Sequence, residues 1–384
     1  MRILIVKTSA LGDIIQVFPV VEFLKKHFPK SEIHFVVLEE NKELPLAHPL
    51  IDKVVIFSRK SIWFSFLSSL FFGKTLSNIF SKFFFNFPGF SNGFSVLGKE
   101  VYDVVFDLQG NLRSGLITFL AKSPKKVGFG KHSVPEWPNF FFTNLHYEVN
   151  KKSNIRAQYL SIVQKYFKLF LEPFELFPKR LLKLNAQERK QKEEEKDLFR
   201  RKTEGEQNEK PVLKKRKSIL IAPFSKWQSK SLDFDFLVSF LKKIEKKYQP
   251  LFLFLQGSEA ERKKSLLLAS HFGSQAVVLD KMSLPLLQHV MEEVDLVIGM
   301  DSCPLHLAML AKRPTVGFFG PTTASVYGAG NDEGHFLAFG GQCLLKLSFD
   351  KRCKPLRNCP QRCIDQHNQE ELFERFSCFY INSL

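Results

Sequence analysis

The chain has 384 residues, of which 44% are hydrophobic, and this excludes a disordered segment and a single small domain. Its 56 Lys and Arg residues against 39 Asp and Glu residues give a formal net charge of +17, which favours an anionic partner or an anionic membrane surface. The sequence contains no zinc-finger or RNA-binding motif, so we expect no nucleic-acid partner. No signal peptide precedes the first apolar segment, which predicts a cytoplasmic protein.

The first residues predict a buried strand over 2–6, then a loop, then a helix from Ile14 to His27. Asp13 stands at the start of that helix. Loops that follow the carboxyl ends of parallel strands face ligands in α/β proteins, which suits a catalytic Asp13. The position also suits a cap, because a carboxylate in a first helical turn accepts hydrogen bonds from backbone N–H groups. Position alone leaves both interpretations open.

Strand-like and helix-like segments alternate along both halves of the chain, which predicts two doubly wound α/β domains with parallel sheets. The predicted strands cover 2–6, 33–38, 53–57, 103–108, 218–222, 251–255, 276–279, 295–299 and 315–319. In the second half, helices are predicted near 233–247, 259–271 and 304–312. We expect domains over 1–184 and 218–384, joined by a charged linker or insertion over 185–217 that is too polar to be buried.

Two segments carry open alternatives. The Phe-rich segment 61–97 is too interrupted to span a bilayer, and it suits either a domain core or the lipid interface. Four cysteines gather near the C-terminus, but only Cys359 and Cys363 have the spacing of a structural zinc pair. We therefore expect reduced thiols and no metal site, with zinc binding by this group as the open alternative. The other two cysteines of this group are Cys343 and Cys353.

A second motif runs from Asp301 to His306 and follows the predicted strand 295–299. Pro304 favours a helix start at this point. Backbone N–H groups near Ser302 and Cys303 would then lack partners within the helix, an arrangement that binds phosphate oxygens. His306 is open to two interpretations, as a ligand contact or as a helix residue packed on the sheet.

Taken together, the motifs resemble those of the ADP-heptose:lipopolysaccharide heptosyltransferases. In chain order, the resemblance rests on 7–13, 103–110, 225–230, 281–284, 301–306 and 318–322. It implies the GT-B glycosyltransferase architecture, with two Rossmann-like domains facing each other across a cleft. The N-terminal domain would bind the acceptor and the C-terminal domain the nucleotide sugar.

The resemblance implies inverting transfer of heptose from ADP-heptose to the Kdo of a Kdo-bearing lipid A, with no cofactor required. Asp13 would act as the base, and Lys230 would bind the diphosphate. The other implied donor-binding residues are Ser225, Ser229, Glu261, Lys281, Met282, Asp301, Ser302, Cys303, Pro304, Leu305 and His306. The expected acceptor-binding residues are Lys7, Ser9, Gly12, Gln109, Asn111, Arg113, Lys131 and Glu136.

Such an enzyme would work on the cytoplasmic face of the inner membrane as a peripheral protein, with the anionic membrane surface as a partner. Two alternatives remain open at this point. One is a heptosyltransferase that adds a later heptose to the lipopolysaccharide core. The other is a non-catalytic, basic protein of the same fold that binds a nucleotide or a lipid.

Overall fold

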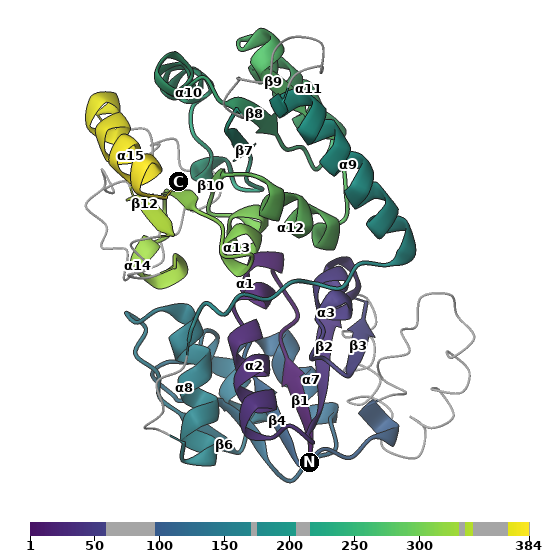
Figure 1. Ribbon diagram of the computed structural model, residues 1–384. Helices are drawn as coiled ribbons and strands as arrows, with labels where there is room; N and C mark the ends of the chain where they lie inside the picture. The colour runs from purple at the N-terminus through teal and green to yellow at the C-terminus, as the bar shows by residue number, and fades with distance from the viewer. Residues whose placement is uncertain (59–96, 170–174, 205–215, 330–334, 341–367, 384) are drawn as a thin grey trace. The chain divides into compact units, whose positions relative to one another are not determined.

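The computed structural model describes residues 1–58, 97–169, 175–204, 216–329, 335–340 and 368–383 (Figure 1). The chain forms two compact units, Met1–Leu176 (unit 1) and Phe177–Leu384 (unit 2). No helix in the described ranges combines the length and the hydropathy that a membrane span requires. Segment 61–97, except its last residue, and Cys343, Cys353, Cys359 and Cys363 lie outside the described residues.

Unit 1 is built on a six-stranded parallel sheet with the strand order β3-β2-β1-β4-β5-β6. Its strands are β1 (Arg2–Val6), β2 (Glu32–Leu38), β3 (Lys53–Phe57), β4 (Val104–Asp107), β5 (Lys126–Phe129) and β6 (Leu145–Tyr147). The order reverses between β1 and β4. The loops that follow these two strands therefore lie side by side at a topological switch point, where open α/β sheets bind ligands.

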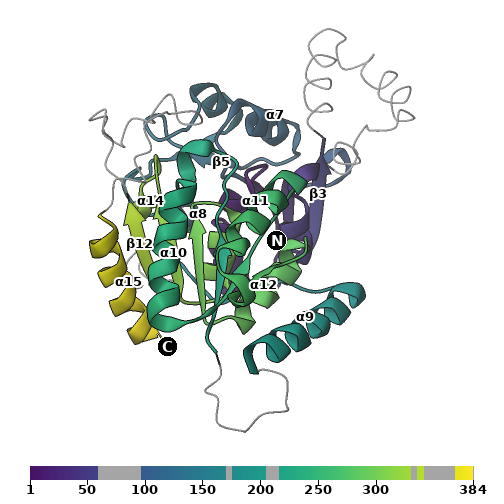
Figure 2. The same cartoon turned by 90° about the horizontal axis from the view of Figure 1, so that it is seen from above.

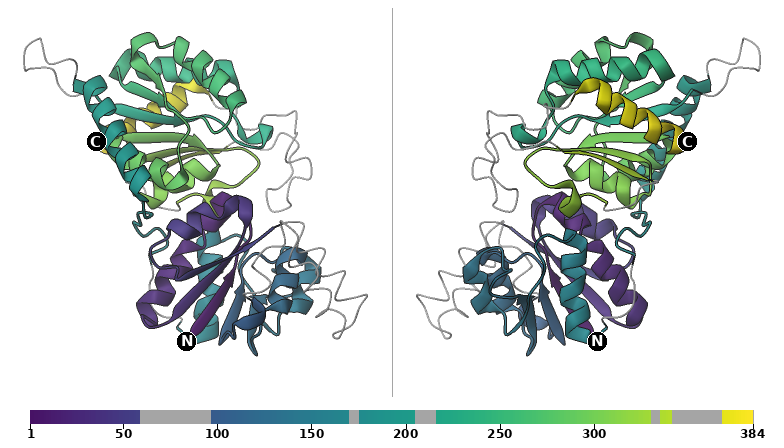
Figure 3. Two further views of the ribbon diagram at one scale, coloured as in Figure 1. Left: turned by 90° about the vertical axis from the view of Figure 1, so that its right-hand side faces the viewer. Right: turned by 90° about the vertical axis from the view of Figure 1, so that its left-hand side faces the viewer.

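Helices cover both faces of the unit 1 sheet. They are α1 (Leu11–Ile15), α2 (Phe18–His27), α3 (Glu43–Ala47), α7 (Leu112–Leu120) and α8 (Ile155–Phe167), with the 3-10 helices η1 (Glu39–Asn41) and η2 (Trp137–Phe142). Figure 3 shows α2 and α8 together on one face and α7 on the other. A core of alternate strand residues, among them Leu4 and Val105, packs against Leu116 and Ile117 of α7.

Unit 2 repeats the same plan, because its sheet has the order β12-β11-β10-β7-β8-β9 and is also parallel. Its strands are β7 (Ser218–Ala222), β8 (Leu251–Phe254), β9 (Ala276–Val278), β10 (Leu296–Met300), β11 (Thr315–Phe319) and β12 (Phe336–Gly340). Counted from the start of the unit, this is again the order 3-2-1-4-5-6. The switch point here lies between β7 and β10.

The unit 2 helices are α9 (Ala186–Glu204), α10 (Phe234–Tyr248), α11 (Glu259–Ser270), α12 (Leu284–Glu293), α13 (Cys303–Leu310), α14 (Ala324–Tyr327) and α15 (Gln369–Ser383), with the 3-10 helices η3 (Gln228–Lys230) and η4 (Gly273–Gln275). Figure 2 shows α10 beside α15. Phe240 of α10 and Phe376 of α15 belong to one large core with the strands. The highly charged α9, inside the segment 185–217, packs against α12.

The structure confirms the predicted fold class and places every predicted strand to within one residue at each end. The single helix expected from Ile14 to His27 is wrong, because the chain forms α1 and α2 with a break at Gln16 and Val17. Pro19 is the physical reason, since proline lacks an N–H and favours the first turn of a new helix.

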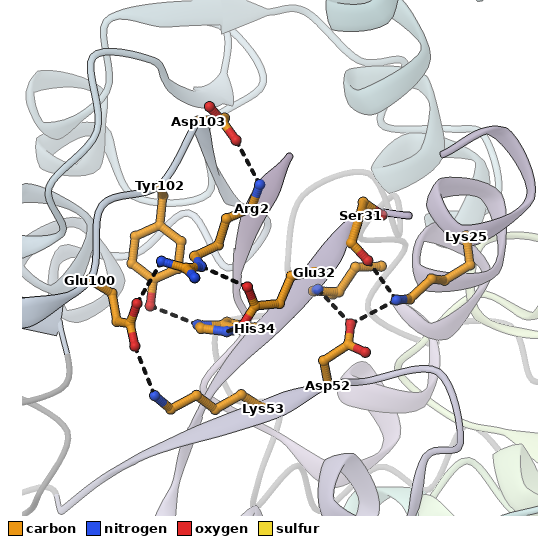
Figure 4. Close-up of polar contacts among 11 residues, drawn as sticks. Arg2, Lys25, Ser31, Glu32, His34, Asp52, Lys53, Glu100, Tyr102 and Asp103 are labelled. Carbon is orange, nitrogen blue, oxygen red and sulfur yellow. Dashed lines mark hydrogen bonds and ion pairs between the residues drawn. The ribbon is translucent and has the colours of Figure 1, made fainter. Parts of the chain in front are cut away.

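A network of charged side chains holds together the amino ends of the central unit 1 strands, opposite the switch point (Figure 4). Arg2 Nε donates to Glu32 Oε2 at 2.8 Å, and Arg2 Nη1 donates to Glu100 Oε2 at 2.7 Å. Lys53 Nζ donates to Glu100 Oε1 at 3.1 Å. The ring of His34 is fully buried, and its Nε2 lies 2.7 Å from Glu32 Oε1. Hydrogen bonds from His34 and Arg2 lower the pKa of Glu32.

We predict that Glu32→Gln lowers the free energy of unfolding at pH 7 by about 0.2–1 kcal/mol, the range for exposed ion pairs. Because the folded-state pKa of Glu32 lies below its ordinary value of 4.5, this stabilisation is complete above about pH 4.5 and is lost as the pH falls through the folded pKa. Denaturant unfolding of the variant and the parent at pH 7 and at pH 3 measures the loss of stability and its dependence on pH. Glu39→Gln, in a pair with Lys42 at 3.7 Å, is the control. A deficit equal at both pH values would contradict the account.

Candidate functional site

The loop after β1 places Asp13 at the switch point of unit 1. Asp13 is the third residue of α1, it is partly exposed, and its carboxylate accepts a hydrogen bond from Ala10 N at 3.2 Å. This is the capping contact that its position suggested. Ser9 N donates to Gln109 Oε1 at 3.2 Å, so the loops after β1 and β4 are joined directly. The predicted residues Ser9, Asp13 and Gln109 therefore lie in one polar region.

Lys7 is buried under this loop and has internal partners. Its Nζ donates to Tyr159 Oη at 2.8 Å and to Leu108 O at 3.2 Å, and it lies 4.6 Å from the centroid of the Tyr159 ring. Burial and the negative charge of Asp13 raise the pKa of Tyr159 well above its ordinary value. The tyrosine hydroxyl therefore stays protonated at neutral pH. Sequence reasoning missed Tyr159, because it stands in the apolar pattern of α8.

Asp107, the last residue of β4, organises the loop that carries Gln109. Its carboxylate is fully buried and accepts hydrogen bonds from Gly110 N and Gln109 N, both at 3.0 Å. Ser114 Oγ donates at 2.9 Å and Asn139 Nδ2 at 2.6 Å. Burial raises the pKa of Asp107, against the hydrogen bonds that lower it. This carboxylate fixes the shape of the loop after β4 from underneath.

Two of the predicted acceptor residues cap α7. Asn111 Oδ1 accepts from Ser114 N at 2.9 Å, and Glu136 Oε2 accepts from Leu112 N at 2.9 Å. Arg113 is half-buried in the first turn of the same helix, and Lys131 is exposed in the loop after β5. The caps give Asn111 and Glu136 a structural use. Their contact with an acceptor, like that of Gly12 in α1, stays a prediction.

The switch point of unit 2 brings together a buried ionic cluster from three loops. Lys230 Nζ donates to Asp301 Oδ2 at 2.6 Å, and the hydroxyl of Thr322 donates to the same oxygen at 2.6 Å. His306 Nε2 lies 3.3 Å from Asp301 Oδ1. Lys230 also lies 5.0 Å from the ring centroid of Trp227. Sequence reasoning selected Lys230, Asp301 and His306 but missed the contributions of Thr322 and Trp227.

The electrostatics of this cluster favour a charged Asp301. The side chain of Asp301 is 4% exposed and that of Lys230 is 15% exposed. Burial alone would raise the pKa of Asp301, but the hydrogen bond with His306 and the charge of Lys230 outweigh it and hold the pKa below its usual range. A stably ionised Asp301 therefore keeps the Lys230 ammonium oriented at the carboxyl end of β7. An ammonium held there suits a phosphate ligand.

The other predicted donor residues lie at the same edge of the sheet, because each follows the carboxyl end of a parallel strand. Glu261 is in the first turn of α11, after β8, where its Oε2 accepts from Gly257 N at 2.7 Å. Lys281 is exposed and Met282 half-buried, between β9 and α12. Ser225 Oγ lies 3.5 Å from Trp227 N, and Ser229 is buried in the same loop.

Helix α13 begins where the motif predicted a helix start. Ser302 is its N-cap residue, and the helix continues with Cys303 and Pro304. The hydroxyl of Ser302 donates to Met300 O at 3.2 Å, so it does not cap the helix N–H groups. Leu305 is fully buried in a core with Phe319, which gives it a packing role. A direct donor contact by Leu305 stays a prediction.

Two Rossmann-like units with the same strand order, each with a polar cluster at its switch point, define the GT-B class of glycosyltransferase fold. Solved structures agree. The glycosyltransferase family 9 structure from Veillonella parvula DSM 2008 gives a TM-score of 0.72 at 17% identity and covers 100% of this chain and 98% of that chain. The E. coli heptosyltransferase WaaC with ADP gives 0.67 at 17% identity and covers 99% and 100%.

The particular family follows from the sequence comparison. The profile of glycosyltransferase family 9 (heptosyltransferase) matches residues 94–355. The chain therefore belongs to this family and is a glycosyltransferase. It is 28% identical to Lipopolysaccharide heptosyltransferase 1 of Campylobacter coli over 327 residues, which are 84% of each chain. It is 32% identical to the Pseudomonas aeruginosa protein of the same name over 142 residues, 35% of this chain and 34% of that one.

We predict that Gly110→Ala disturbs the loop after β4. Gly110 has a φ of +72°, and a Cβ there would come within 2.5 Å of Pro135 Cδ. The strained backbone and the clash should lower the free energy of unfolding by about 1–3 kcal/mol and reduce turnover, because Gln109 moves with the loop. Gly98→Ala is the control, since nothing lies within 4 Å of its Cβ position. Equal stability of the two variants would contradict this role.

Proposed function

We propose that the protein is a lipopolysaccharide heptosyltransferase that transfers heptose from ADP-heptose to the Kdo of a Kdo-bearing lipid A, with inversion at the anomeric carbon. Family membership and the similarity to the Campylobacter coli enzyme support the heptosyl transfer. The observation that carries the assignment of the donor site is the Lys230–Asp301 pair, because Asp301 holds the Lys230 ammonium group at the carboxyl edge of the unit 2 sheet.

Unit 2 would bind the donor. Lys230 has three N–H donors, and only one is needed for Asp301, so the others can bind diphosphate oxygens. The N-terminal N–H groups of α13 add a second set of donors for the same anion. Both would stabilise the negative charge that develops on ADP as it leaves. Glu261 would bind the ribose hydroxyls, while Lys281 and Met282 would flank the adenine.

Unit 1 would bind the acceptor and supply the base. In the proposed step the acceptor hydroxyl oxygen forms a bond to the anomeric carbon while the bond from that carbon to the diphosphate breaks. Asp13 takes the hydroxyl proton, and ADP leaves. The hydrogen bond from Ala10 N keeps the Asp13 carboxylate in position for this proton transfer. Lys7 and Tyr159 hold the surrounding loops in place, and the amide N–H groups of Gln109 would donate to an anionic acceptor.

The location of the enzyme and its independence of a cofactor are also proposals. We place the enzyme on the cytoplasmic face of the inner membrane, as a peripheral protein with no required cofactor. A later heptose as the product, or ligand binding without catalysis, are the competing functions. Both would leave the Lys230–Asp301 cluster useful for a nucleotide, so only turnover separates them from the proposal.

Asp13→Asn separates the two uses of this carboxylate. An amide oxygen can still accept the hydrogen bond from Ala10 N, but an amide cannot take a proton as a base. We expect the variant to melt within about 2 °C of the parent, to bind ADP equally, and to lose at least about 10²-fold in kcat. The measurement is ADP release from ADP-heptose with deacylated Kdo-lipid A as acceptor. Undiminished turnover would rule out Asp13 as the base.

Lys230→Met tests the proposed diphosphate site and has a control in the same loop. Removing the ammonium should weaken ADP binding about 10-fold or more, because a charge-assisted contact in a partly buried site is lost. Titration calorimetry with ADP measures this. Lys226 is exposed in the same loop, and Lys226→Met should bind ADP like the parent. If the two variants bind ADP equally well, the diphosphate does not contact Lys230.

A further inference from the structure

Three large aromatic side chains in the described part of unit 1 are exposed, and they lie on two neighbouring helical elements. Among the described residues, the large hydrophobic side chains that are exposed include three aromatic ones, Phe119 at 62%, Trp137 at 55% and Phe141 at 66%. All three belong to α7 or η2, which pack against each other. An exposed aromatic cluster has a cost in water, so its position indicates a contact surface.

The geometry of η2 explains why these rings point outward. A 3-10 helix has three residues per turn, so Asn139 and Phe142 share one side. Asn139 Nδ2 donates to Asp107 Oδ2 at 2.6 Å. Phe142 packs on α7 at Gly115, where a Cβ would come within 2.5 Å of its ring. The inward side of η2 is thus fixed on α7, and Trp137 and Phe141 stand outside, with their ring centroids 4.8 Å apart.

A lysine lies beside one of the three exposed rings, that of Phe119. Lys126 Nζ lies 5.5 Å from the centroid of the Phe119 ring and donates to Phe119 O at 2.7 Å. Lys122 is exposed and follows Phe119 by three residues. Aromatic rings beside lysines are the composition of a protein face in contact with lipid headgroups, where rings enter the acyl boundary and ammonium groups meet phosphates. We name Phe119, Lys122, Lys126, Trp137 and Phe141 the aromatic–lysine surface.

This surface adjoins the loop assigned to the acceptor. Glu136, the residue before Trp137, caps α7 through Leu112 N, and Glu136 N donates to Gly110 O at 3.0 Å. Gly110 follows Gln109 directly. A membrane touching Trp137 would therefore lie beside the loop that is proposed to bind a lipid-linked acceptor.

We propose that the aromatic–lysine surface docks unit 1 on an anionic phospholipid bilayer. The positive net charge of +17 adds attraction for such a bilayer over the whole chain. The biological use of this docking, which is access to a lipid-linked acceptor, rests on the proposed function. Lipid binding itself can be measured without turnover. Lipid contact by 61–97, one of the two alternatives that the sequence left open for that segment, is independent of this surface.

The test is flotation with vesicles of phosphatidylcholine and phosphatidylglycerol. Trp137→Ser/Phe141→Ser should lower the partition coefficient at least about tenfold, because two exposed rings no longer enter the lipid. The matched control is Leu266→Ser/Leu267→Ser, which removes two exposed apolar side chains from α11 of unit 2 and should bind like the parent. Equal binding by both double variants would overturn the proposal.

A second readout localises the contact. The chain has three tryptophans, Trp63, Trp137 and Trp227. In Trp63→Phe/Trp227→Phe, emission from Trp137 should shift to shorter wavelength on these vesicles. Bound protein with unshifted emission would place the contact elsewhere.

A lysine variant tests the charge of the surface. In Lys122→Ala/Lys126→Ala the partition coefficient should fall about tenfold or more on the anionic vesicles and change little on vesicles of phosphatidylcholine alone. If Trp137→Ser/Phe141→Ser binds vesicles like the parent but no longer self-associates, a second copy of the chain covers the surface, and the proposal is overturned.

The two proposals fail separately. If both hold, Trp137→Ser/Phe141→Ser keeps the parent rate on deacylated, soluble Kdo-lipid A and loses rate on acylated Kdo-lipid A that is embedded in vesicles. Parent protein that binds vesicles through this surface but turns over neither acceptor would support the docking surface and overturn the proposed function. Equal rates for the double variant and the parent on the embedded acceptor would overturn the docking role.

Discussion

Parallel strand pairing, with a reversal of strand order at the middle of each sheet, is the constraint on which both candidate sites depend. The reversal places two loops side by side that are far apart along the chain. In unit 1 it joins the Asp13 loop to Gln109 through the hydrogen bond from Ser9 N. In unit 2 it joins Lys230 to Asp301 across 71 residues of sequence. The polar chemistry at each switch point follows from the strand order.

Two buried aspartates, Asp107 and Asp301, have different roles because their surroundings differ. Asp107 receives hydrogen bonds from neutral donors only, burial raises its pKa, and its use is to shape a loop. Asp301 is also buried, but Lys230 and His306 lie against it and keep its pKa low. An ionised Asp301 orients the lysine proposed to bind diphosphate. The same residue type is thus a loop support in unit 1 and part of an ionic site in unit 2.

Nine of the twelve strands in the described part of the chain could be predicted from the sequence, because each is a short apolar run, as in 2–6 or 218–222. The strands β5, β6 and β12 were missed, because they are only three to five residues long and are polar or interrupted by glycine. Lys230 and Asp301 could be selected because their motifs follow such runs. The partners could not, since Tyr159 and Asn139 come from helices whose packing no local pattern records. The run Trp137–Phe142 is apolar except for Asn139, and only its packing on α7 determines which rings are exposed.

The central proposal is that this chain transfers heptose from ADP-heptose to a Kdo-bearing acceptor. Mass spectrometry of the products tests it most directly, with deacylated Kdo-lipid A and with the same acceptor already carrying one heptose. The account predicts that the first acceptor gains one heptose, with ADP released in equal amount. A gain by the second acceptor alone would identify addition of a later heptose. Protein that binds ADP but modifies neither acceptor would contradict the proposed activity.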